Sequence, residues 1–209
     1  MTHTRLPRVC AALAAAASFS ACSTADIDET DHGAFFVDAR VRKAMGGEAN
    51  HEGPFVVEAG WSMLDGSTGP LDYRIQTVSF GGGVELPAAE DLWIGLGAGL
   101  MGRFNDFDTT TGTLDEEDGY GVYLMVEGGW HATTWLEPYA RLYTDGTLNE
   151  LSTLQQFEAG ARFHFIDHAA LFVGWRYAAY VIDDIDSAFN VSSVELDASG
   201  VIVGLHVAL

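Results

Sequence analysis

The sequence is short of several residue types, and each shortage excludes a class of protein. It has 10 basic residues against 30 acidic ones, and Lys43 is its one lysine. A net charge of −20 lacks the basic stripes of nucleic-acid-binding proteins, so no nucleic-acid partner is expected. After the N-terminus there is no apolar run of about 18 or more residues, so no transmembrane helix is expected. This does not exclude a membrane β-barrel, whose strands need only about 9–11 residues each.

The first 21 residues have the pattern of an export signal. Arg5 and Arg8 precede an Ala-rich apolar run over residues 9–19, and small residues follow it. The ending Phe-Ser-Ala-Cys22 is similar to a bacterial lipobox, in which the cysteine is lipidated and becomes the first mature residue. Ordinary signal cleavage, which leaves Cys22 unmodified or removes it, is the alternative.

Cysteine is scarce, with Cys10 and Cys22 as the two in the chain. Cys10 leaves with the signal, so no intrachain disulfide is expected. Removal of residues 1–21 takes away two arginines and no acid, and the mature charge becomes 8 − 30 = −22. Residues 22–33 are acidic and polar and are predicted to form a flexible tether. Residues 34–53 are predicted to be an N-terminal segment or an extra strand.

Residues 92–101 alternate strictly between a bulky apolar face and a small one. This period of two is typical of a β-strand, because successive side chains of an extended chain point to opposite faces. The apolar face holds Leu92, Ile94, Leu96, Ala98 and Leu100, and the other holds Trp93, Gly95, Gly97, Gly99 and Met101. A membrane barrel accounts for both faces, with lipid against the first and a narrow lumen against the second. The glycines lie inside a strand with no helix after it, so a nucleotide-binding loop is not expected.

Similar alternating segments recur along the chain between turn residues. They are 34–44, 54–64, 71–86, 120–131, 135–145, 157–165, 171–180 and 201–209. In the segment 71–86 the alternation blurs near Gly81-Gly82-Gly83, where a β-bulge is plausible.

The connections between these segments alternate in length. Short links follow Leu86, His131 and Ile166, whereas long acidic links follow Phe104, Asp145 and Asp183. Outer-membrane barrels have short periplasmic turns and long outer loops. The sequence therefore predicts an all-β fold, an antiparallel up-and-down transmembrane β-barrel over residues 54–209. Eight strands are favoured and ten are the alternative, because bacterial single-chain barrels have an even number of strands.

Charged residues of the predicted barrel fall on the small face of the strands. Charge is costly against hydrocarbon, and in a narrow lumen each charge needs a partner, so Arg/Glu pairs that brace the lumen are expected. This bracing role is favoured over catalysis. The predicted lumen network consists of Glu58, Arg74, Arg103, Glu127, Glu137, Arg141, Glu158, Arg162 and Arg176.

Three stretches carry a resemblance to a known family. Residues 78–87 (VSFGGGVELP), 92–100 (LWIGLGAGL) and 201–209 (VIVGLHVAL) resemble strands of the small outer-membrane β-barrel family, the OmpA/OmpX-like, porin-like eight-stranded proteins. The resemblance covers about residues 54–209. It implies the outer membrane of a Gram-negative bacterium, insertion by the barrel-assembly machinery, contact with outer-membrane lipid, and a structural or surface-interaction role. The last residue, Leu209, departs from the aromatic residue usual in the family.

The histidines and acidic residues of the chain bear on other possible functions. Some small barrels modify lipid A, but His131, His164 and His206 lack the His-Ser pair of such deacylases, and no enzyme activity is expected. The turn residues Asp167 and His168 are not expected to bind a metal, and no cofactor is expected. The acidic loops could bind divalent cations loosely. A lipid-anchored soluble barrel that binds a small apolar ligand is the runner-up.

Overall fold

The structure is a computed structural model and describes residues 25–45, 54–69, 71–109, 112–113, 118–147, 153–183 and 191–209. These residues are almost entirely β-strand, and they contain no helix long and apolar enough to cross a membrane. The strands are β1 Ala25–Met45, β2 Phe55–Thr68, β3 Leu71–Pro87, β4 Leu92–Thr109, β5 Gly112–Thr113, β6 Asp118–Trp130, β7 Leu136–Thr147, β8 Thr153–Ile166, β9 Ala169–Asp183 and β10 Val191–Ala208.

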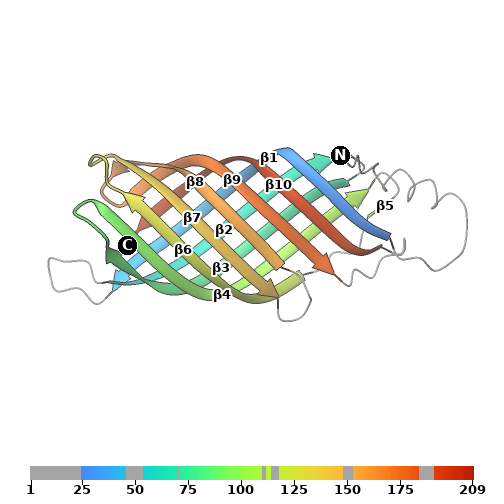
Figure 1. Ribbon diagram of the computed structural model, residues 1–209, viewed down its shortest axis with the longest axis horizontal. Helices are drawn as coiled ribbons and strands as arrows, with labels where there is room; N and C mark the ends of the chain where they lie inside the picture. Colours follow the sequence, from blue (N-terminus) through green and yellow to red (C-terminus); the bar gives the residue numbers. More distant parts are fainter. Residues whose placement is uncertain are drawn as a thin grey trace, which may run out of the picture.

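Nine of the strands in the described residues close into a barrel (Figure 1). The two-residue β5 pairs only with the end of β4. Each barrel strand is antiparallel to its neighbour in the chain, and β4 pairs with β6 across β5. The barrel closes between β1 and β10, which run parallel, with Phe35 opposite Val201.

The predicted strand number of eight or ten is wrong, because the segment 34–44 is part of a barrel strand. In β1, Phe35 to Met45 pair with β2, and most of the strand also pairs with β10. An odd number of strands can close a barrel because the first and last strands then run parallel, a pairing only slightly less stable per residue. Alternation along one segment does not reveal which strands it will pair with.

The acidic segment before residue 34 is also more ordered than a tether. Residues 25–33, which were predicted to be flexible, belong to β1 and pair with β10 from Ala25 to Asp31. A register shift between Asp31 and Ala34 separates this part of β1 from the rest. The predicted signal sequence and Cys22 lie outside the described residues.

Short and long connections lie at opposite ends of the barrel. The turns 88–91, 131–135 and 167–168 lie at one end together with the C-terminal Leu209, here called the turn end. The links after β4, β7 and β9 and the start of β1 lie at the other, the loop end (Figure 1). The loop end also holds the tight β2–β3 turn, where Gly69 has a φ of 55° that favours glycine. The six links named in the prediction therefore segregate as expected, but the rule does not hold for the whole barrel, because the nine-residue link from β1 to β2 joins strand ends at the turn end.

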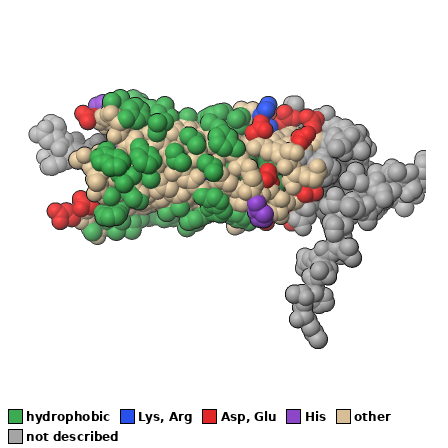
Figure 2. Space-filling view, turned by 90° about the horizontal axis from the view of Figure 1, so that it is seen from above, with side chains coloured by type: hydrophobic (Ala, Val, Ile, Leu, Met, Phe, Trp, Pro, Cys, Tyr) green, Lys and Arg blue, Asp and Glu red, His purple; other side chains and the backbone are tan. Residues whose placement is uncertain are grey.

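The outside of the barrel is apolar over much of its length, as the alternation predicted. Hydrophobic side chains cover this surface in Figure 2. We call it the belt; its members include Phe35, Val41, Val78, Phe80, Ile94, Leu96, Leu100, Val122, Leu124, Val126, Leu142, Phe157, Phe163, Leu171, Val173, Trp175, Val201 and Leu205, all well exposed.

The small inner face allows the barrel wall to pack closely against lumen side chains. Gly81 and Gly99 lie opposite each other in β3 and β4. A Cβ added to Gly99 would lie 2.7 Å from Cε1 of Tyr123, whose ring stacks on Tyr143 with centroids 5.1 Å apart. The bulge considered near Gly81 is wrong, since β3 pairs there with β2 and β4 without a register shift.

Candidate functional site

The most distinctive feature of the interior is a group of six charged side chains near its middle, here called the central cluster. Alternation of the strands turns all six inward, and five strands contribute to the group. Three arginines face three acids, so the formal charges balance. Its members are Asp38 and Arg40 of β1, Glu58 of β2, Arg141 of β7, Glu158 of β8 and Arg176 of β9, each at most 7% exposed.

Glu158 is the hub of the central cluster. Arg40 donates to its two carboxylate oxygens at 3.0 and 2.9 Å. Arg176 donates to Oε2 at 3.1 and 2.6 Å, and the Tyr139 hydroxyl donates to Oε1. The same two arginines also donate to Asp38, at 2.8 and 2.5 Å. Two guanidinium groups thus share two carboxylates, which satisfies charge in a space that water barely reaches.

The remaining pair of the central cluster lies beside this hub. Arg141 donates to Oε1 of Glu58 at 2.8 Å, across the lumen between β7 and β2. Aromatic rings complete the surroundings of the arginines. The Arg40 guanidinium lies 4.8 Å from the centroid of Phe172, and that of Arg176 lies 5.3 Å from Phe36, distances suited to cation–π contacts.

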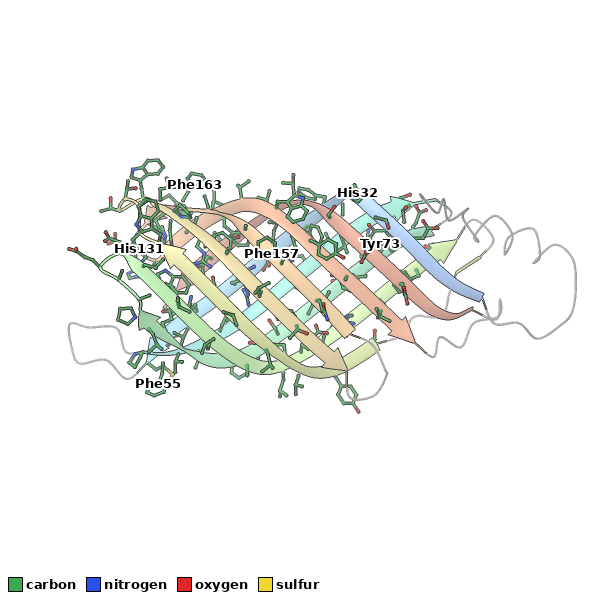
Figure 3. All side chains as sticks on the ribbon, in the orientation of Figure 1. His32, Phe55, Tyr73, His131, Phe157 and Phe163 are labelled. Carbon is green, nitrogen blue, oxygen red and sulfur yellow. The ribbon has the colours of Figure 1, made fainter. Side chains whose placement is uncertain are left out.

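A second charged group fills the lumen towards the turn end. Arg162 donates to Glu137 at 2.7 Å and also pairs with Glu127. His164 Nε2 lies 3.0 Å from the other oxygen of Glu137. Arg42 pairs with Glu85 nearby. His131 is more exposed and lies near the turn end, as Figure 3 shows.

A third pair lies on the loop-end side of the central cluster. Arg103 of β4 and Asp145 of β7 form a salt bridge in which both side chains are fully buried. The Arg103 guanidinium also lies 5.6 Å from the centroid of the Tyr180 ring. Charge pairing therefore extends over much of the interior, in three successive groups.

The structure brings most of the predicted lumen network together inside the barrel. Buried Arg/Glu salt bridges are present, with Glu58, Arg103, Glu127, Glu137, Arg141, Glu158, Arg162 and Arg176 all buried.

The assignment of Arg74 to the lumen is wrong. Arg74 lies outside, about half exposed, and pairs with Asp65 at 2.7 Å. Its neighbours Tyr73 and Ile75 are the side chains that point inward. Their apolar character suggested an outward position, but near the loop end the apolar side chains fill the interior. Counting in twos from the outward Val78 places Arg74 outside.

Sequence reasoning missed part of the lumen network. Asp38, Arg40 and Arg42 were on the polar face of segment 34–44, and they were left out because that segment was not assigned to the barrel. Asp145 is the last residue of the predicted strand 135–145, next to the acidic link, and was not included in the predicted network. In each case the alternation placed the residue on the inner face, and only the strand count or boundary was at fault.

The interior leaves little room for a ligand or a reacting group. A cavity of about 30 Å³ adjoins the central cluster and is lined by its six members with polar neighbours such as Ser62 and Gln156. Such a volume suits on the order of one or two water molecules. The described residues contain no group of three or more His, Cys, Asp or Glu placed to hold a metal ion. The acidic loop residues Asp115, Glu116 and Glu117 lie outside the described residues.

Comparison of the chain with models of known protein families, with functionally characterised proteins and with solved structures finds no match. The fold and its charged interior are therefore the basis on which function is inferred.

Proposed function

We propose that this protein is an integral β-barrel of a Gram-negative outer membrane, with a structural or surface-interaction role rather than a catalytic one. Its partners would be membrane lipid on the belt and the barrel-assembly machinery during insertion. The observation that carries the proposal is the combination of an apolar outside with a charged inside. A soluble protein of this size rarely exposes such an apolar surface, because water disfavours it.

The dimensions of the belt fit a membrane. On β4 the outward apolar side chains run from Leu92 to Phe104, twelve residue steps. At about 3.3 Å per residue and a tilt of about 40°, this spans roughly 30 Å, close to the ~25 Å apolar band of outer-membrane barrels. Aromatic side chains lie at the turn-end edge of the belt, where Trp135 stacks on Phe163 with centroids 6.4 Å apart. Such aromatic residues are typical of the boundary between lipid and water.

The filled lumen supports a structural role over transport or catalysis. Small barrels have interiors that side chains can fill, unlike the wide channels of 16–18-stranded porins. Here ion pairs and aromatic rings occupy that space, and His164 and His206 point into it. The runner-up, an apolar-ligand carrier, would need an apolar pocket of about 300 Å³ or more. The cavity at the central cluster is about tenfold smaller and is lined by the six charged side chains of that cluster.

The proposal is tested by placing a charge on the belt. Leu96→Arg puts a cation near the middle of the belt, where it costs roughly 2–4 kcal/mol against hydrocarbon. Gln155→Arg is the matched control on an outward position that is already polar. In a Gram-negative host we expect the parent and Gln155→Arg to fractionate with outer membranes and to show heat-modifiable migration, and Leu96→Arg to insert poorly. Recovery of the parent as a soluble periplasmic protein would refute the proposal.

A further inference from the structure

The interior of the barrel changes character towards the loop end. Beyond the Arg103–Asp145 pair it is filled by apolar and aromatic side chains that are almost inaccessible. They form one packed cluster with Phe36, Tyr139 and Phe172, the aromatic residues that contact the central cluster. Its loop-end members are Leu64, Tyr73, Ile75, Phe107, Leu154 and Leu196, each at most 3% exposed.

The outer surface of the barrel becomes polar along the same part of the strands. Each inward apolar residue is next to an outward polar one: Leu64 precedes Asp65, Phe107 precedes Asp108, and Leu154 precedes Gln155. On the belt the polarity of the two faces is reversed. There the inward residue is charged and the outward residue is apolar, as with Glu158 and its neighbour Phe157. Figure 2 shows the hydrophobic surface giving way to polar and acidic side chains at this end.

The change occurs at matching register positions on the three neighbouring strands β7, β8 and β9. On β7, β8 and β9 the last outward residues of the belt are Leu142, Phe157 and Tyr177, which lie opposite one another in register. Two residues further towards the loop end, the outward row is Thr144, Gln155 and Ala179. These three strands share the boundary, so it is not a local exception in one strand.

The strands are also longer than a membrane crossing requires. About 9–11 residues suffice for a tilted transmembrane strand. β4 and β10 have 18 residues each and β3 has 17. On β3 the outward apolar residues begin at Val78, which leaves the first seven residues of the strand (71–77) beyond the belt.

We propose that only the turn-end part of the barrel lies in the membrane and that the loop-end part stands in water as a folded extension. We call this part the collar; Asp65, Asp72, Arg74, Asp108, Gln155 and Asp197 are among its outward residues. The collar has the pattern of a soluble barrel, polar outside and apolar inside, and its core closes the lumen at that end. This inference rests on the proposed membrane location and adds where the membrane boundary lies.

Site-specific labelling separates the collar from the belt. Single cysteines at Gln155 and Ala161 of β8, both outward, form one matched pair, and Asp108 and Leu100 of β4 form a second. The full chain carrying Cys10→Ser and Cys22→Ser is reconstituted in phospholipid nanodiscs, where both membrane faces meet solvent. Reaction with a charged, water-soluble maleimide is followed over time, and repeated after unfolding in detergent and urea to show that each thiol is reactive.

We expect Gln155→Cys and Asp108→Cys to react with the maleimide in the nanodisc. Ala161→Cys and Leu100→Cys should stay unreactive there and react only after the protein is unfolded. Protection of all four positions would overturn the collar while leaving the membrane location intact. Rapid reaction at Ala161→Cys and Leu100→Cys would instead overturn the membrane location itself, because the belt would then face water.

Discussion

Neutralising the hub of the central cluster should destabilise the barrel strongly. Glu158→Gln keeps the shape of the side chain but removes the negative charge that Arg40 and Arg176 share. The two guanidinium groups would then have Asp38 as their nearest carboxylate. The amide nitrogen of Gln would also face N–H donors, so at least one hydrogen bond would become a repulsive contact.

The size of the effect follows from burial. Glu158 is 2% exposed, and breaking a buried ion pair by removing one partner costs on the order of 3–5 kcal/mol. With a urea dependence of about 2 kcal/mol per molar, the unfolding midpoint should fall by roughly 1.5–2.5 M. Asp65→Asn is a matched control, since it also changes a carboxylate that faces an arginine to an amide. Its pair with Arg74 is about half exposed and screened by solvent, so the midpoint should barely move.

The measurement is urea unfolding of the full chain from phospholipid vesicles, followed by tryptophan fluorescence and by the compact band on unheated gels. The double variant Glu158→Gln/Arg176→Gln leaves Arg40 paired with Asp38. It should therefore be less destabilised than the sum of its single variants. If Glu158→Gln unfolds at the same urea concentration as Asp65→Asn, the central cluster does not stabilise the barrel as argued.

Three further predictions follow from the fold. Gly99→Ala should lower the free energy of unfolding by about 1–3 kcal/mol, and the urea midpoint with it, because its Cβ would meet Phe80 O at 2.4 Å. Gly102→Ala, with 3.8 Å to its nearest neighbour, should leave the midpoint unchanged, and equal midpoints for the two variants would contradict the tight lumen. If the barrel spans the membrane as proposed, its nine strands place the two ends of the chain on opposite sides. In intact cells one of two tags, before Ala25 or after Leu209, should then be accessible to antibody; tags found together on one side would contradict the strand number. Cys22→Ala should abolish labelling by radioactive fatty acid; a parent chain that takes up no label would show that the lipobox assignment is wrong.

Sequence alone was enough to predict the barrel wall and most of its interior. A period of two is a local property of an extended chain, so the two faces of segments such as 92–101 follow from side-chain order without knowledge of any neighbour. The inward positions of Arg141, Glu158 and Arg162 follow in the same way, because charge is excluded from the apolar face of each strand. The links after Leu86, His131 and Ile166 share one end because consecutive strands of the barrel run antiparallel, which depends only on chain order.

Pairing between distant segments was decided by the tertiary structure. The parallel contact of β1 with β10 joins Phe35 to Val201, and no local pattern specifies a partner so far along the chain. The partners of Glu158 were hidden for the same reason, since Arg40 is 118 residues away. Arg74 was assigned to the wrong face because the polarity of the two faces reverses where the barrel passes from belt to collar. In the belt the polar side chains point inward, whereas in the collar they point outward. Alternation reveals that a strand has two faces, but what covers each face depends on the position of that residue along the barrel.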